Sequence, residues 1–216
     1  MSKQFWIIIA VIILAVGGVV VFNNHKNSGS SSASSTSPTN HLRGGGTSGV
    51  TLLEYGDFQC SACEYSHPLV EAVYSKYSSQ LTFQFRNFPL TSLHPNAFAA
   101  ARAAEAADQQ GKFWDMYSML YDSTNWSAWT VSSNPQPYFQ QYATSLGLNL
   151  DKFNQDFSSS KINDIVRADL ASATALNLTG TPSYFLDGKL VANPPQDIGG
   201  WSQLIDAAIA SKQSAH

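Results

Sequence analysis

The chain contains only two cysteines, Cys60 and Cys63, and they stand three positions apart. Cysteines that stabilise a fold are usually spread along a chain, because a disulfide constrains the unfolded state most when it closes a long loop. A bridge between these two would close almost nothing. The pair follows a β-rich apolar segment, residues 50–56, and a short loop, and it opens a predicted helix over 60–78. The sequence therefore predicts a reactive pair at a strand-to-helix junction.

Such a junction gives the two sulfur atoms different surroundings. The first turn of a helix leaves backbone N–H groups unpaired, and their partial positive charge stabilises a thiolate. Cys60 stands at that end of the predicted helix, in the outer position where a sulfur is attacked. Cys63 lies one turn further in, within bonding reach, in the position of a resolving thiol.

Two further features are candidates for the surroundings of the pair. Glu54 lies inside the apolar strand, on the same face as Leu52 by alternation. A buried carboxylate has a raised pKa and could take a proton from Cys63, whereas a glutamate at a strand edge would face solvent. Thr181-Pro182 precedes a second predicted strand, and an X-Pro bond can be cis.

The N-terminal region divides into two segments of contrasting composition. Residues 5–22 are uncharged and almost wholly apolar, and as a helix they would span roughly 27 Å, close to a bilayer core. We predict a single transmembrane anchor over 1–22, with a longer-than-usual cleaved signal peptide as the alternative. Residues 23–49 are rich in Ser, Gly, Asn and Thr and predict a flexible linker. The folded domain is then expected over 50–213.

The remaining chain predicts an α/β domain with many helices. Residues 81–88 alternate like a strand, and 187–188 form a hairpin turn between strands 183–186 and 189–192. Helices are predicted over 96–110, 112–121, 135–146, 151–159, 161–176 and 199–211, and a long loop is predicted over 122–134. The aromatic residues at helical spacing, Phe113, Trp114, Tyr117 and Tyr121, are expected in the core. The net charge of −3 argues against a nucleic acid partner.

Three segments, LLEYGDFQCSACEYSHP, FRNFPLTSLHPNAFAAARAAEAADQQGKFWDMYSMLY and GTPSYFLDGK, together resemble the thioredoxin superfamily and, more narrowly, its DsbA-like family of exported disulfide oxidoreductases. The resemblance covers about residues 50–212. It implies a thioredoxin fold with a helical insertion over about 95–177. It also implies that Glu54 is a buried acid, that Pro182 is a cis-proline with Thr181 beside the disulfide, and that Pro68 kinks the active-site helix.

The function implied by the resemblance is the oxidation of exported proteins. Cys60 would exchange with thiols of exported substrates on the extracytoplasmic side of the cell membrane. No quinone or flavin motif is visible, so no cofactor is expected and a separate membrane protein would reoxidise the pair. The dipeptide Ser61-Ala62 differs from the Pro-His of strong oxidases, and the acids Asp57 and Glu64 would oppose a thiolate.

Three alternatives remain open at this stage. The same fold could serve a reductase or an isomerase, because the spacing of the cysteines does not fix the direction of electron flow. Cys60, Cys63 and His67 could instead hold a metal in a tethered binding module. An enzyme that uses bound glutathione is a third possibility, although such enzymes often lack a C-x-x-C motif. His67 and His94 are otherwise expected to be polar surface or loop residues.

Overall fold

The computed structural model describes residues 36–214. The predicted anchor over 5–22 lies outside the described residues. Among the helices of residues 36–214, none combines the length and apolar character needed to cross a bilayer.

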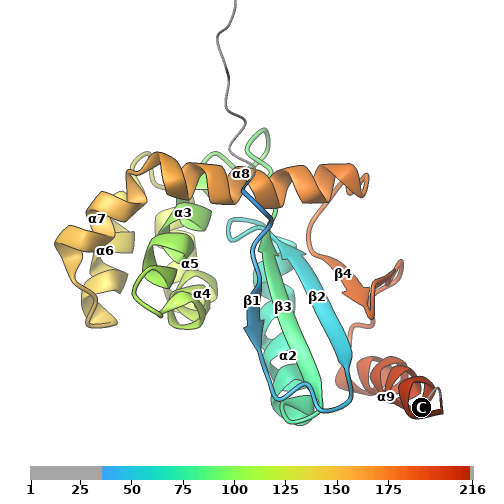
Figure 1. The fold of residues 1–216 in the computed structure, drawn as a ribbon. Helices are drawn as coiled ribbons and strands as arrows, with labels where there is room; N and C mark the ends of the chain where they lie inside the picture. Colours follow the sequence, from blue (N-terminus) through green and yellow to red (C-terminus); the bar gives the residue numbers. More distant parts are fainter. Residues whose placement is uncertain (1–35, 215–216) are drawn as a thin grey trace, which may run out of the picture. The chain divides into compact units, whose positions relative to one another are not determined.

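A five-stranded sheet forms the centre of the described domain, in the order β1-β3-β2-β4-β5 (Figure 1). Strands β2 (Val50–Gly56) and β3 (Leu81–Asn87) are parallel, and the crossover helix α2 (Ser61–Tyr77) joins them. Strands β1 (His41–Arg43) and β4 (Ser183–Leu186) add antiparallel on either side, and β5 (Lys189–Leu190) pairs with β4. This confirms the predicted strand–helix–strand unit and the late hairpin.

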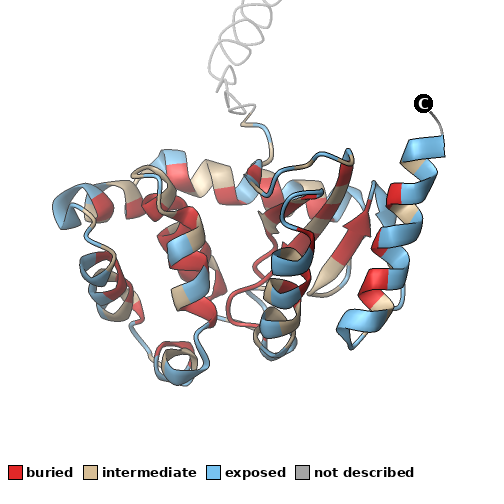
Figure 2. Ribbon diagram, turned by 90° about the horizontal axis from the view of Figure 1, so that it is seen from below, coloured by how far each residue is buried: buried red, intermediate tan, exposed pale blue. Residues whose placement is uncertain are grey.

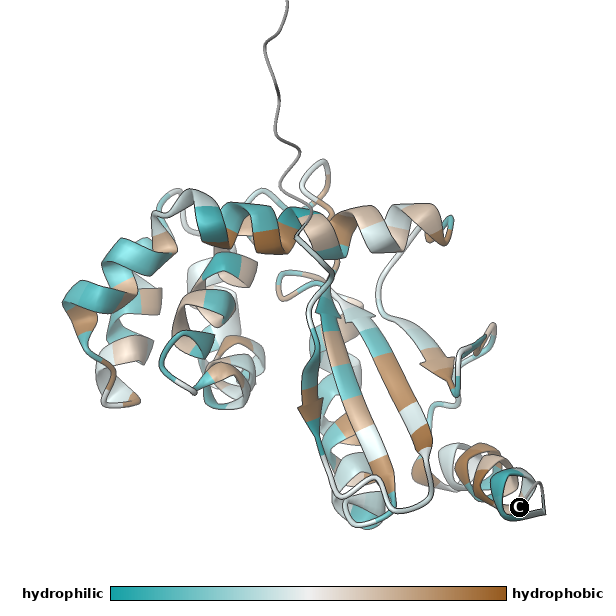
Figure 3. Ribbon diagram, in the orientation of Figure 1, coloured by the Kyte–Doolittle hydropathy of each residue, from teal (hydrophilic) through white to brown (hydrophobic). Residues whose placement is uncertain are grey.

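Apolar residues follow one another along the central strands, which Figure 3 colours partly brown, and they pack on both faces of the sheet. One face carries Leu52 and Phe83, which pack against α2 and against α9 (Ile198–Ser214). The opposite face carries Tyr55 and Phe185, which pack against Ala173 of α8 (Ser160–Ala175). Because both faces are covered, the central strands can be apolar along nearly their whole length.

A helical insertion between β3 and β4 makes a second core. Its helices are α3 (Ala97–Asp108), α4 (Phe113–Tyr121), α5 (Ser123–Thr130), α6 (Gln136–Ser145), α7 (Leu150–Phe157) and α8. Their buried sides face inward (Figure 2), and α3 contributes a run of small residues that lets its neighbours approach closely. Cys60, which caps α2, and Cys63 within α2 also belong to this core. The pair therefore lies where the insertion meets the sheet.

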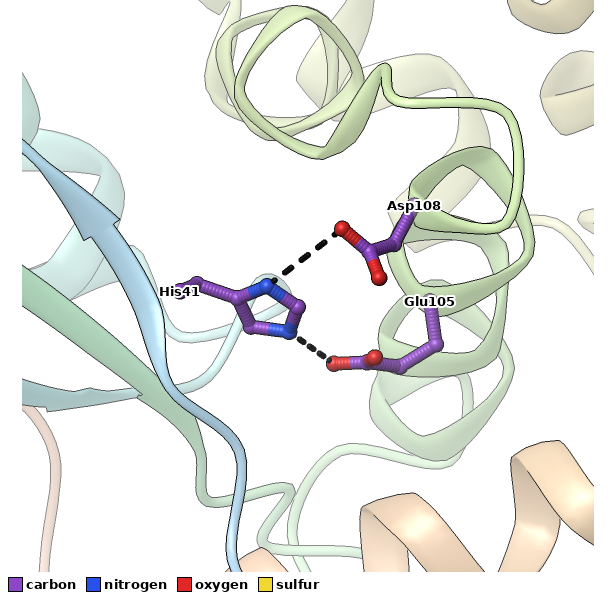
Figure 4. A group of neighbouring side chains, drawn as sticks. All are labelled: His41, Glu105 and Asp108. Atoms are coloured by element: carbon purple, nitrogen blue, oxygen red, sulfur yellow. Dashed lines mark hydrogen bonds and ion pairs between the residues drawn. The ribbon is translucent and has the colours of Figure 1, made fainter.

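The predicted linker over 23–49 is wrong for its last part, because residues 41–43 form β1. His41 is buried between β1 and α3, with its Nε2 2.8 Å from Glu105 Oε1 and its Nδ1 3.6 Å from Asp108 Oδ1 (Figure 4). Thr39 donates both its backbone N–H and its hydroxyl to Asp169 of α8. Polar residues are ordered here because carboxylates far along the chain bind them.

The predicted loop over 122–134 is also wrong, since α5 occupies most of it. The side chain of Asp122 accepts a hydrogen bond from the backbone N–H of Thr124 and caps the helix. Trp129 is fully buried and anchors the helix in the insertion. The capping signal was present in the sequence, but the run of polar residues obscured it.

Candidate active site

Cys60 and Cys63 lie at the start of α2, as predicted. Cys60 is the N-cap residue, with extended backbone angles, and its backbone N–H donates to the Asp57 carbonyl at 3.0 Å. Both cysteines are free thiols. Cys60 is 8% exposed and Cys63 only 1%. The helix start therefore holds one sulfur at the surface of the core and the other inside it.

The two thiols have opposite proton affinities. A hydrogen bond from the Cys63 thiol, supported by the Thr181 side chain and the backbone N–H groups of Cys63 and Ala62, lowers the pKa of Cys60 to about 5 against the effect of burial. Burial raises the pKa of Cys63 well above its usual value, and the neighbouring Cys60 and Glu54 act in the same direction. Near neutral pH the reduced pair therefore consists of a Cys60 thiolate and a Cys63 thiol.

Glu54 is buried on the sheet face that meets α2, which confirms the predicted orientation. It pairs with Phe85 of β3 and Tyr184 of β4, and its side chain is 1% exposed. Burial raises the pKa of Glu54 from 4.5 to about 8, against the lowering effect of Arg43. Its charge acts on Cys63. A carboxyl with this pKa can both accept and return a proton near neutral pH.

The segment before β4 completes the surroundings of Cys60. The Thr181-Pro182 peptide bond is cis, as the sequence resemblance implied. In its thiol form Cys60 donates from Sγ to the Thr181 carbonyl at 3.4 Å. Pro182 also lines a groove of about 450 Å³ beside the pair. The other groove residues come from α2, β4, α9 and the loop before α9, and they include Ala62, Tyr65, Leu69, Tyr184, Pro195 and Trp201.

The loop before the pair is organised by Asp57, whose role the sequence did not reveal. Asp57 is buried and accepts hydrogen bonds from the backbone N–H groups of Gln59 and Leu90, at 2.8 and 2.9 Å. His94 Nδ1 lies 2.7 Å from Asp57 Oδ2, the oxygen that also accepts from Leu90. Gln59 in turn binds Asn96 and Thr130 of the insertion. Asp57 is therefore a loop-organising residue, held by several donors.

His67 and two tyrosines border the inner side of the pair. The His67 side chain is only 14% exposed, so the prediction of a polar surface or loop position is wrong for this residue. Its ring contacts those of Tyr117 and Tyr121, which are buried as predicted. Across residues 36–214, the one cluster of metal-ligating side chains is His41, Glu105 and Asp108, and it includes neither cysteine.

Solved structures with this fold include disulfide exchange proteins. Wolbachia pipientis alpha-DsbA1 is 20% identical, with a TM-score of 0.69 over 86% of this chain and 99% of that one. BdbD from Bacillus subtilis is 17% identical, with a TM-score of 0.65 over 81% and 96% of the two chains. At these identities the comparison establishes the fold alone.

Sequence comparison gives closer relatives. A protein of Mycolicibacterium gilvum named Na(+)/H(+) antiporter NhaA 1 is 36% identical over 160 residues, 72% of this chain and 24% of that one. The chain thus spans about a quarter of the length of the curated relatives it matches. A family model described as Thioredoxin matches residues 36–207, which includes β1 and every candidate site residue. With the cysteine pair, the buried acid and the cis-proline in place, the chain belongs to the thioredoxin family.

Proposed function

We propose that this protein is an extracytoplasmic thiol-disulfide oxidoreductase that introduces disulfides into exported proteins. The observation that carries the proposal is the unequal proton affinity of the two thiols: the pKa of Cys60 is lowered to about 5 and that of Cys63 is raised. A stabilised thiolate is a good leaving group, so a disulfide at Cys60 is readily broken by an incoming substrate thiolate. The reduced form is favoured, which is the property of an oxidant.

The reaction follows from the positions of the two sulfurs. A substrate thiolate attacks Cys60 Sγ of the disulfide, forming a mixed disulfide and releasing Cys63 as a thiolate that takes a proton from the Glu54 carboxyl. A second substrate thiolate then attacks the substrate sulfur of the mixed disulfide. The substrate leaves with a new disulfide and Cys60 leaves as a thiolate, so two electrons have passed from substrate to enzyme.

The groove beside the pair supports a polypeptide substrate. Its aromatic and proline side chains offer apolar contacts that do not depend on one sequence, and Tyr65 is exposed at its border. Extended or unfolded segments fit such a surface. Reoxidation of the dithiol requires an electron acceptor, and we assign that role to a separate membrane protein.

The location is part of the proposal. Residues 5–22 would anchor the chain in the cell membrane and leave the domain outside the cytoplasm, where disulfides persist. Protease treatment of intact and lysed cells tests this: digestion of the domain only after lysis would contradict it. The antiporter name of the sequence relatives belongs to proteins about four times as long as the matched region, and we do not extend it to this chain.

The decisive measurement is the reduction potential of the Cys60–Cys63 couple against glutathione, together with the pH titration of thiolate absorbance. An oxidase should show a thiolate midpoint near pH 5 and a potential well above that of thioredoxin, about −270 mV. A potential near the thioredoxin value would make the protein a reductase. Bound zinc that survives dialysis, lost on Cys60→Ser, would support a metal module instead.

A further inference from the structure

Glu54 must exchange a proton with solvent in every catalytic cycle, yet it is buried. In the proposed reaction, reduction of the pair places one proton on Cys63, and reoxidation removes it. The Glu54 side chain is only 1% exposed, so this proton must cross a layer of protein.

Glu54 is followed by a chain of contacting side chains, in which several buried polar atoms have no hydrogen-bond partner among the described residues. They are Glu54 Oε2, the hydroxyls of Tyr117 and Tyr121, and His67 Nε2. The rings of His67, Tyr117 and Tyr121 touch one another, with centroids 5.1 to 5.3 Å apart. Tyr117 approaches Glu54 without a well-formed hydrogen bond, and its hydroxyl lowers the pKa of Glu54. Such atoms are rare in folded proteins, and together they provide the partners that a buried water needs.

The outer end of this group reaches the surface at Glu71. His67 Nε2 lies 3.7 Å from Glu71 Oε1, and the Glu71 side chain is 30% exposed. Arg43 of β1 binds both Glu71 oxygens and is held between the rings of Tyr74 and Trp114. Glu71 is therefore a fixed acceptor in contact with solvent.

His67 has the properties of a group that passes a proton on. Burial lowers the pKa of His67, and its charged neighbours are Glu71 on its own helix, Arg43 of β1 and Asp122 before α5. Its neighbours from α4 are the tyrosines, whose own pKa values are raised by burial. A neutral imidazole accepts a proton on one nitrogen and donates from the other.

We propose that His67 relays the proton between Glu54 and Glu71 through the hydroxyls of Tyr117 and Tyr121, a role that rests on the proposed exchange at Cys60 and Cys63. On reoxidation, the Glu54 carboxylate takes the proton of the Cys63 thiol as that sulfur attacks Cys60 and the partner thiolate leaves. The proton then passes to His67, to Glu71 and to solvent. Reduction runs the same route inward. His67 acts through Glu54, so it is a positioning residue rather than a catalytic one.

The test compares His67→Gln and Tyr121→Phe with the unmodified full-length protein. Glutamine keeps polar contacts but cannot relay a proton, and phenylalanine removes only a hydroxyl. Closure of a mixed disulfide between Cys60 and a peptide thiol is followed by stopped-flow from pH 5.5 to 9. We expect a rate about tenfold lower at pH 7 in both variants, restored in His67→Gln by added imidazole, with the reduction potential unchanged.

Tyr142→Phe is the matched control, because Tyr142 also has a buried hydroxyl without a described partner but lies on α6 in the insertion. It should close the disulfide at the unmodified rate. An unmodified rate and pH profile in His67→Gln would overturn the relay and leave the proposed function standing. A slower rate that imidazole does not restore, with a shifted potential, would show a structural role. Failure of the unmodified protein to exchange with the peptide would refute the proposed function itself.

Discussion

Glu54 and Glu105 are two buried carboxyl groups of the same domain with opposite surroundings. Each side chain is 1% exposed. Glu105 of α3 lies 2.8 Å from His41 Nε2 and accepts a hydrogen bond from Asn87 Nδ2 at 2.7 Å. Glu54 of β2 has no described partner at its Oε2 atom. The Glu105 carboxyl is held by two short polar contacts, whereas the Glu54 carboxyl has one oxygen without a partner among the described residues.

The difference separates structural from chemical use of a buried acid. Burial raises the pKa of both groups. For Glu105 the hydrogen bond and the charge of His41 counter that rise, so the carboxylate joins β1 to α3. For Glu54 the opposing influences come from Arg43 and Tyr117, and its pKa still reaches about 8. A buried acid with an unpaired oxygen is unfavourable for stability, and the pKa of Glu54 suits proton transfer.

Removal of the Glu105 carboxyl should have the largest effect on stability. We expect Glu105→Ala to lower the free energy of unfolding by about 3–5 kcal/mol, because His41 and Asn87 lose a buried partner. Urea denaturation of the reduced protein measures this. The thiolate midpoint of Cys60 should stay near pH 5, since Glu105 is not among the groups that set it. A stable Glu105→Ala variant would refute the structural role.

Removal of the Glu54 carboxyl should instead affect the exchange reaction. We expect Glu54→Gln to slow closure of a mixed disulfide at Cys60 by about 100-fold, equivalent to about 2.7 kcal/mol, because Cys63 loses its proton acceptor. The free energy of unfolding at pH 8 should not fall. Stopped-flow kinetics and urea denaturation of the same preparation separate the two effects. A destabilised variant with normal kinetics would reverse the assignment.

The pH dependence of stability should also distinguish the two acids. The pKa of Glu54 is raised from 4.5 to about 8 in the folded protein, so the native state holds this proton more tightly than the unfolded chain does. Its contribution to stability is full below pH 4.5 and is lost as the pH rises through about 8. Between these values we expect the stability to fall with a slope of about 1.4 kcal/mol per pH unit. Unfolding free energy is measured against pH for the reduced unmodified protein and for reduced Glu54→Gln, and the difference between the two curves isolates the contribution of Glu54. A difference that does not change with pH would contradict the raised pKa of Glu54.

The smallest predicted effect concerns Thr39, whose contacts with Asp169 help to hold the segment before β1. Thr39→Val removes the hydroxyl that donates to Asp169 Oδ2 at 2.7 Å but leaves the backbone bond to Oδ1. We expect a loss of about 1.5 kcal/mol in the free energy of unfolding. An unchanged stability in Thr39→Val would mean that the segment before β1 contributes little.

The surroundings of Glu54 could be predicted from the sequence, whereas those of Glu105 could not. Cys60, Cys63 and Glu54 lie within one strand–loop–helix unit, where alternation and helix geometry fix which way each side chain faces. Glu105 sits in an alanine-rich helix, and its partner His41 lies in a polar segment that predicts a linker. Only tertiary packing brings them together, and local patterns carry no information on it.

The errors at α5 and His67 have related causes. The residues of α5 are mostly polar or aromatic, and the helix depends on its Asp122 cap and on burial of Trp129. His67 lies on a helix whose exposed and buried sides alternate, but α4 covers that part of it. The formation of α5 and the burial of His67 both depend on packing against elements that are distant in the sequence.

The pairing of β2 with β4 also has a consequence for when this protein gains its reactivity. Glu54 stands opposite Tyr184, and the whole helical insertion lies between them along the chain. Contacts that close so long a loop are costly to form early in folding. Cys60 and Cys63 already stand together in one turn of α2, but Thr181 reaches them only after β4 has docked. We therefore expect Cys60 of a newly made chain to be less acidic than in the folded protein until the last strands have docked and Thr181 has joined the local groups that stabilise its thiolate.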